Sequence, residues 1–185
     1  MPKTTLQSRT VAAGNKWTTI AEEKFSFDDG RQGQYLIVER PTAVGMLPLL
    51  KQDGKYYTYM VRQYRYPIDQ EVWQFPMGSL DEGKDMLEHA KDELRQETGL
   101  IADKVTLLRE YFMDPGLSRQ RSVFYVGEGV QEGGEQELEE EEKGMIYKKI
   151  PLTDLDGMIA DGTITDFWGY IGIRLLQDYV AGLSA

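Results

Sequence analysis

Residues 78–100 read GSLDEGKDMLEHAKDELRQETGL, a stretch that predicts one amphipathic helix. Asp85 is a suitable N-cap with Glu88 as its capping-box partner, and Gly99 suits the left-handed residue that ends many helices. At about 100° per residue, three apolar side chains fall on one stripe that should face a sheet. These are Leu87, Ala90 and Leu94. We therefore predict a helix over Asp85–Glu97.

Two glutamates of this helix, Glu93 and Glu97, are four residues apart and share one face. That face adjoins the apolar stripe, so both carboxylates should lie at the edge of the core. Two like charges there repel one another and lose hydration unless a cation lies between them. Carboxylate oxygens at this spacing suit Mg²⁺ or Mn²⁺. Taken alone, however, such a pair is most often a solvated surface feature.

Short runs of aromatic and β-branched residues predict strands on both sides of this helix. They are 17–20, 24–27, 34–38, 46–50, 56–64, 105–112 and 123–126. Asp53-Gly54 separates two of these runs and predicts a tight hairpin. Further helices are expected at 152–160 and 168–179. This order of elements predicts an α+β or α/β sandwich with a mixed sheet.

Composition excludes several classes of function. The 185 residues include 31 acidic and 21 basic side chains, and the formal charge of −10 argues against a nucleic-acid-binding protein. No cysteine is present, and the single histidine excludes multi-histidine zinc centres. Neither a membrane span nor a signal peptide is expected, because no apolar run is long enough. We expect a soluble cytoplasmic protein without a membrane partner.

The stretch 78–100 resembles the Nudix box, G-x5-E-x7-R-E-U-x-E-E-x-G-U, where U is a bulky apolar residue. The matching positions are Gly78, Glu93, Leu94, Glu97, Gly99 and Leu100. Four more stretches resemble ADP-ribose and ADP-sugar pyrophosphatases of this family: 61–67, 74–78, 113–118 and 159–166. The resemblance implies the Nudix fold, an α/β/α sandwich with a mixed sheet. It also implies an N-terminal region of antiparallel strands, 1–42, used in dimerisation, before a Nudix domain over 43–185.

Three positions depart from the box. Lys84 and Asp92 stand where the family has an acid and an arginine, and Gln96 replaces the first glutamate of the Glu-Glu pair. We hypothesise that Lys84 and Asp92 keep an ion pair between loop and helix with its polarity reversed. The alternative is that both positions are exposed and free to vary. Gln96 should lower the affinity for metal, because an amide offers a neutral oxygen where a carboxylate offers a charge.

The resemblance implies a metal-dependent site. Glu93 and Glu97 match the principal metal ligands, together with the backbone carbonyl of Met77 and, as a weakened ligand, Gln96. A catalytic carboxylate is expected from the acidic segment 132–143, where the register leaves Glu141 and Glu142 as alternatives. The other glutamates of this segment are expected to be solvated. His89 is expected to be a polar surface residue.

The same resemblance suggests residues that bind substrate. Arg65 and Arg40 match positions near phosphate, although a surface ion pair is the alternative for each. Trp17 and Tyr35 match aromatic residues that stack a purine between two subunits, with packing as the alternative. This spacing suggests a homodimer with swapped N-terminal strands. The loops around Trp17, Tyr35 and Leu117 should determine the preferred base and sugar.

We therefore expect a Nudix pyrophosphohydrolase that uses Mg²⁺ or Mn²⁺ to hydrolyse a nucleoside diphosphate sugar. ADP-ribose or a related ADP-sugar is the expected substrate, and a nucleoside monophosphate and a sugar phosphate are the products. An alternative is a catalytically weakened Nudix module that binds a nucleotide-sugar as a sensor or partner domain. A third interpretation, hydrolysis of oxidised nucleoside triphosphates, is disfavoured by the N-terminal strands.

Overall fold

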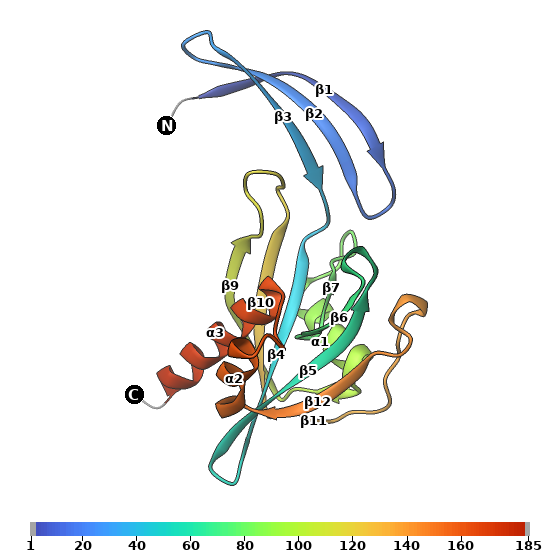
Figure 1. The fold of residues 1–185 in the computed structure, drawn as a ribbon, viewed down its shortest axis with the longest axis vertical. Coiled ribbons are helices and arrows are strands. Elements are labelled where there is room, and N and C mark those ends of the chain that lie inside the picture. Colours follow the sequence, from blue (N-terminus) through green and yellow to red (C-terminus); the bar gives the residue numbers. More distant parts are fainter. Residues whose placement is uncertain (1–2, 184–185) are drawn as a thin grey trace. The chain divides into compact units, whose positions relative to one another are not determined.

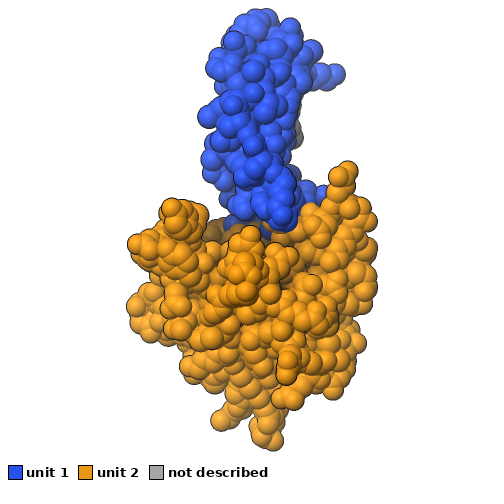
Figure 2. All heavy atoms as spheres, turned by 90° about the vertical axis from the view of Figure 1, so that its right-hand side faces the viewer, with its two compact units in different colours: residues 1–43, 110–122 blue, residues 44–109, 123–185 orange. Residues whose placement is uncertain are grey.

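The structure, a computed structural model, describes residues 3–183, and the chain divides into two compact units. The smaller unit consists of the chain up to residue 43 together with 110–122. The larger unit consists of 44–109 together with the chain from 123 onward, and Figure 2 colours the two units separately. Nothing in the sequence analysis predicted that the segment 110–122 belongs with the N-terminal strands.

A seven-stranded mixed sheet is the centre of the larger unit (Figure 1). Its main path is β12 (Ile146–Pro151), β5 (Lys55–Arg65), β4 (Ala43–Gln52), β10 (Arg121–Glu128) and β9 (Lys104–Phe112). In addition, β6 (Gln70–Gln74) pairs with β5, and β7 (Met77–Ser79) pairs with β4. A separate small ladder joins β8 (Leu100–Ile101) to β11 (Gln131–Glu132).

Helices cover both faces of this sheet (Figure 1). On one face, α1 (Met86–Thr98) buries Ala90 and Leu94 against Val123 and Tyr125 of β10. The other face packs against α2 (Leu155–Ala160) and α3 (Phe167–Leu183). There the intervening β10 residues Phe124 and Val126 are buried, as the two-residue period of a strand requires. The expected α/β/α sandwich is therefore confirmed, as are the helices expected at 152–160 and 168–179.

Local chemistry explains where the principal elements begin and end. The Asp85 carboxylate caps α1 by accepting the backbone N–H of Leu87 at 3.0 Å and of Glu88 at 3.1 Å. At the other end Gly99 has φ +70°, and a Cβ there would overlap the carbonyl oxygen of Gly134. Asp53 and Gly54 have φ of 50° and 74°, the turn that a two-residue hairpin needs.

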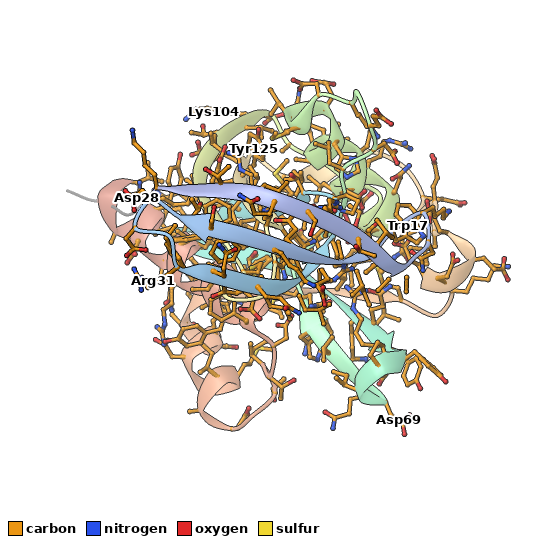
Figure 3. The ribbon with its side chains drawn as sticks, turned by 90° about the horizontal axis from the view of Figure 1, so that it is seen from above. Trp17, Asp28, Arg31, Asp69, Lys104 and Tyr125 are labelled. Atoms are coloured by element: carbon orange, nitrogen blue, oxygen red, sulfur yellow. The ribbon has the colours of Figure 1, made fainter. Side chains whose placement is uncertain are left out.

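The remaining short helices are single 3₁₀ turns. They are η1 (Tyr66–Ile68), η2 (Glu140–Glu142) and η3 (Leu152–Asp154). Of these, η1 carries the chain from β5 into β6, and Asp69 follows it with φ 51° (Figure 3). No helix within residues 3–183 combines the length and apolar character that crossing a membrane requires.

The smaller unit contains an antiparallel sheet in the order β1 (Thr4–Gly14), β2 (Thr19–Phe27) and β3 (Gln32–Glu39). Trp17 lies at one end of this sheet, and Asp28 and Arg31 lie at the other (Figure 3). The sequence did not predict β1, because all of its residues are exposed and no burial alternates along it. The segment 110–122 is held by the backbone of Val38, which donates to Leu117 O at 3.0 Å.

Candidate active site

Glu97 is the most deeply buried carboxylate of α1, with 2% of its surface exposed. Its Oε2 accepts the backbone N–H of Met77 at 3.1 Å, which ties the helix to β7. Burial is the main cause that raises its pKa well above the usual value, and the negative charges of Glu93 and Glu142 add to this. The Met77 hydrogen bond and the Arg65 charge oppose the rise only in part.

Glu93 lies one turn earlier on the same face, with 12% of its side chain exposed. Burial raises the pKa of Glu93 to about 7, Glu142 adds to this, and the Lys84 ammonium opposes it. The carboxylate lies so close to Gly78 that a Cβ at this position would overlap it. With Gly78 at this position, the Glu93 carboxylate can lie directly beside the β7 backbone.

The donor chemistry of this pair fits a hard divalent cation. Glu97 is buried and Glu93 is largely so, and burial together with nearby negative charges raises the pKa of both carboxyls. A bound cation would offset this cost of ionising them. Within residues 3–183 no three acidic or histidine side chains converge to form a complete cage. An ion here would need a backbone carbonyl, water or substrate oxygens as further ligands. Mg²⁺ is commonly held in this way, by one or two carboxylates and phosphate oxygens.

The acidic segment is anchored to the C-terminal end of α1. The backbone N–H of Glu137 donates to Gln96 O at 2.8 Å, and the side-chain amide of Gln136 donates to Glu97 O at 2.5 Å. Beyond this anchor, Glu139 and Glu142 form a capping box across η2. The segment is thus held against the helix that carries the buried carboxylates.

Of the two alternatives in this segment, Glu142 is the one coupled to the buried pair. It is partly buried, and its charge raises the pKa of both Glu93 and Glu97. Glu141 is exposed. The structure therefore favours Glu142 over Glu141 as the acidic residue beside the pair.

Arg65, the last residue of β5, begins a series of polar contacts that the sequence did not reveal. Its Nε and Nη2 donate to Gln74 Oε1 at 3.0 and 2.6 Å. The amide nitrogen of the buried Gln74 donates to Asp166 Oδ2. Asp166 Oδ1 in turn accepts the backbone N–H of Gly169 in α3 at 2.8 Å. Gln74 and Asp166 lie in stretches that resemble the pyrophosphatases. That resemblance was the one signal in the sequence that could have pointed to these two residues.

His89 is not a surface residue, and the expectation that it would be is wrong. Only 3% of its surface is exposed, and it faces Glu93 across one turn of α1. Burial is the largest cause that lowers its pKa, followed by the positive charge of Lys84. Asp81, the Gly78 backbone and Asp92 oppose this shift. A helical wheel alone placed this ring on the flank of the helix and did not show what covers it.

In the smaller unit, the four predicted substrate residues line two separate hollows. Tyr35 and Leu117 line one of about 190 Å³, together with Ile37 and residues 115–119. Trp17 and Arg40 line another of about 190 Å³, formed by residues 15–19 and 39–41. Each is smaller than the roughly 300–1,000 Å³ that encloses a whole ligand.

A buried acidic residue in the smaller unit forms ion pairs that the sequence analysis did not predict. Glu23 of β2, 7% exposed, accepts from Arg9 at 2.9 Å and from Arg119 at 2.7 Å. Both arginines also reach Glu39 of β3. The network joins the three strands to the end of the loop that contains Leu117. The hydrogen bonds from the two guanidinium groups lower the pKa of Glu23.

Comparison with known proteins now identifies the fold. A model of the NUDIX domain matches residues 39–166, more than half of the chain. The chain belongs to the NUDIX family. The match begins at the end of β3 and ends at Asp166, so it includes α1 and the side chains of Arg65, Gln74 and Asp166.

Among proteins of known function, this NUDIX chain is similar to an ADP-ribose pyrophosphatase of Bacillus subtilis (strain 168). The two are 24% identical over 176 residues, which cover 93% of this chain and 94% of that protein. An ADP-ribose pyrophosphatase of Mycobacterium tuberculosis (strain ATCC 25618 / H37Rv) is 27% identical over 141 residues, 76% and 68% of the two chains. A crystal structure of an ADP compounds hydrolase has the same fold, with a TM-score of 0.82 and 19% sequence identity. The match covers 98% of this chain and 96% of that one.

The NUDIX chain is therefore a hydrolase of the ADP-ribose pyrophosphatase-like kind. Its larger unit brings together Glu93, Glu97 and the Met77 backbone on adjoining elements, with Glu142 and Arg65 electrostatically coupled to them. Gln96 is partly buried on the same helix, and its backbone carbonyl anchors the acidic segment. Trp17, Tyr35, Arg40 and Leu117 belong to the smaller unit.

Proposed function

We propose that this NUDIX hydrolase cleaves the pyrophosphate linkage of a nucleoside diphosphate sugar, with ADP-ribose or a related ADP-sugar as substrate. The products are a nucleoside monophosphate and a sugar phosphate. The observation that carries the proposal is the buried pair Glu93 and Glu97, tied to the Met77 backbone. Similarity to two ADP-ribose pyrophosphatases supports the choice of substrate.

Glu93, Glu97 and the Met77 carbonyl would hold Mg²⁺ or Mn²⁺, with Gln96 as a weaker neutral ligand. When bound, the ion neutralises diphosphate oxygens and lowers the pKa of a coordinated water. The two glutamates must both be ionised for this, although burial raises the pKa of each. In the proposal, a bound cation offsets the cost of ionising both carboxylates.

Glu142 is the carboxylate that we assign to the attacking water. It either takes the water's proton or orients the water toward phosphorus. Its partial burial and its coupling to both metal ligands support this role over Glu141. Attachment of the acidic segment to the carbonyl of Gln96 keeps this carboxylate beside the helix.

Arg65 is proposed to bind the diphosphate of the substrate. A planar guanidinium matches phosphate oxygens, and Gln74 holds two of its nitrogens in one orientation. Arg40, Trp17, Tyr35 and Leu117 are proposed to contact the nucleotide, the two rings by stacking on the base. We further propose a homodimer with swapped N-terminal strands, in which the rings of one base site come from two subunits. The exposed apolar residues of β1 and β3, Leu6, Val11 and Leu36, support such a contact.

The test is a hydrolysis panel with Mg²⁺ or Mn²⁺ over ADP-ribose, other nucleotide-sugars, dinucleotides and nucleoside triphosphates. Glu97→Gln serves as the blank, and Glu141→Gln is the matched control for Glu142→Gln. We expect turnover of ADP-sugars that is abolished by Glu97→Gln and lowered at least tenfold by Glu142→Gln but not by Glu141→Gln. Turnover that survives Glu97→Gln would mean that the site has been misplaced.

A second function, binding of a nucleotide-sugar without turnover, is favoured by one observation. Gln96 stands where the Nudix box has a glutamate, so one charged ligand is missing. Calorimetry with ADP-ribose distinguishes the two proposals when no substrate is hydrolysed. Binding without turnover would establish the sensor, whereas turnover rejects it.

A further inference from the structure

His89 is the single histidine of the chain, and it is buried in a polar setting that the proposed mechanism does not use. Its Nε2 lies 3.2 Å from Oε1 of Glu93. Neither ring nitrogen has a partner with hydrogen-bond geometry among residues 3–183. The contact with Glu93 is therefore within ion-pair distance but misaligned. The Gly78 backbone also acts on the ring and raises its pKa, as do the charges of Asp81 and Asp92, but none of them completes hydrogen-bond geometry with a ring nitrogen.

Such a residue needs an explanation, because a buried N–H without an acceptor is costly. Losing a partner at a buried donor costs about 1–3 kcal/mol, and nearly all buried polar groups in proteins are satisfied. An apolar side chain of similar size would avoid this cost, as Ala90 and Leu94 do on the neighbouring stripe. A histidine retained here is best explained by an acceptor that becomes aligned in another state of the site.

Glu93 is the acceptor that the geometry offers. Its carboxylate lies against the backbone of Gly78, where a Cβ would overlap it. On another side is the imidazole of His89, one helical turn away. Carboxylates that bind metal are themselves held by hydrogen bonds, and such bonds are often long or misaligned until the site is loaded.

We propose that His89 is a positioning residue whose Nε2–H donates to Oε1 of Glu93 in the metal-loaded enzyme and fixes the orientation of that carboxylate. This inference rests on the proposed function only in taking Glu93 as a metal ligand. It requires a proton on Nε2 and no change in the charge of the ring. The role belongs to this chain's own residues and touches neither substrate nor the reacting atoms.

Nitrogen NMR tests the proposal on the unmodified protein. Because His89 is the only histidine, the ¹⁵N spectrum of the side chains contains a single imidazole. We expect Nε2 to carry the proton and its resonance to shift on addition of Mg²⁺. An Nε2 without a proton in the Mg²⁺-loaded protein, or a resonance that Mg²⁺ leaves unchanged, would overturn the proposal.

Substitutions give a second, independent readout, the dissociation constant of Mn²⁺ measured by electron paramagnetic resonance. His89→Leu keeps the size and removes the donor, so Mn²⁺ should bind about tenfold more weakly, whereas His89→Gln, whose amide nitrogen can replace Nε2, should restore most of the affinity. Thr58→Val is the matched control: it removes a fully buried hydroxyl from β5 and should change the melting temperature but not Mn²⁺ binding. Unchanged Mn²⁺ affinity in His89→Leu would show that the ring only fills space.

Should His89→Leu fail to fold, His89→Asn and His89→Gln still separate the outcomes, because an asparagine amide replaces Nδ1 and not Nε2. Tighter Mn²⁺ binding by His89→Gln than by His89→Asn supports the proposal, and the reverse order contradicts it. Glu93→Gln distinguishes this failure from a failure of the proposed function. If Glu93→Gln leaves Mn²⁺ binding intact, the assignment of the metal site is wrong. If Glu93→Gln weakens Mn²⁺ binding but the His89 variants do not, only the positioning role of His89 is wrong.

Discussion

The ammonium group of Lys84 lies 2.9 Å from Oδ2 of Asp92, so an ion pair joins the loop before α1 to the second turn of that helix. The hydrogen bond to Asp92 is the main cause that raises the pKa of Lys84. The hypothesis of a helix-to-loop pair at these two positions is thereby confirmed. Its polarity is the reverse of the acid and arginine that the Nudix box has there.

Exchanging the two charges should preserve this pair. We expect Lys84→Glu and Asp92→Arg each to lower the free energy of unfolding by about 0.5–1 kcal/mol, because both side chains are partly exposed. The double variant should recover part of that loss. A double-mutant cycle by urea denaturation measures the coupling, and strictly additive losses would show that the two side chains do not stabilise each other.

Glu97→Gln should stabilise the metal-free enzyme while removing its affinity for the ion. The carboxylate is buried beside other negative charges, and an amide can still accept the Met77 N–H. At pH 8 we expect a gain of roughly 1–3 kcal/mol in the free energy of unfolding, and no stabilisation by Mg²⁺. Chemical denaturation with EDTA or Mg²⁺ measures both. A loss of stability in EDTA would contradict this account of the buried pair.

In the metal-free protein, the contribution of Glu93 to stability should fall as pH rises. The folded pKa of Glu93 is about 7 against 4.5 for a free glutamate, so the cost of ionising it is absent below about pH 4.5 and complete above about pH 7. Glu97 shifts in the same direction. Mg²⁺ should therefore raise the melting temperature more at pH 8 than at pH 5.5. Equal increases at both pH values, with Mg²⁺ at saturation, would contradict the prediction.

The polar chain from Arg65 should tolerate a paired exchange better than a single one. Gln74→Glu places a second carboxylate beside Asp166 and should cost about 1–3 kcal/mol of stability and raise KM. Adding Asp166→Asn restores a donor opposite that acceptor and should reverse much of both effects. Thermal denaturation and steady-state kinetics provide the measurements. If KM is unchanged in Gln74→Glu, the orientation of Arg65 does not depend on this chain.

Glu23 should make the smaller unit sensitive to acid. Its folded pKa is lowered by Arg119 and Arg9, so the stability it contributes is present above pH 4.5 and is lost as pH falls through the lower, folded value. At pH 7, Glu23→Gln should destabilise the unit by about 1–2 kcal/mol. Hydrogen exchange of β1–β3 measures this. The neighbouring Glu22→Gln is the control and should change exchange little, since the contacts of Glu22 with Lys24 and Gln34 are exposed to solvent.

Much of the larger unit follows from local patterns. The extent of α1 was predictable because Asp85, the apolar stripe and Gly99 lie within one helix and act on neighbouring residues. The same holds for the hairpin at Asp53-Gly54. The pairing of Glu93 with Glu97 was predictable because helical geometry places residues four apart on one face.

What only the tertiary structure decided involves residues far apart in the chain. Gln74 and Asp166 are 92 residues apart, and no periodicity links them. That the structure favours Glu142 over Glu141 depends on how the acidic segment is attached to the end of α1. The burial of His89 likewise depends on packing that a helical wheel does not contain. Sequence patterns report the face on which a side chain lies, whereas burial and hydrogen bonding depend on what the rest of the chain places against that face.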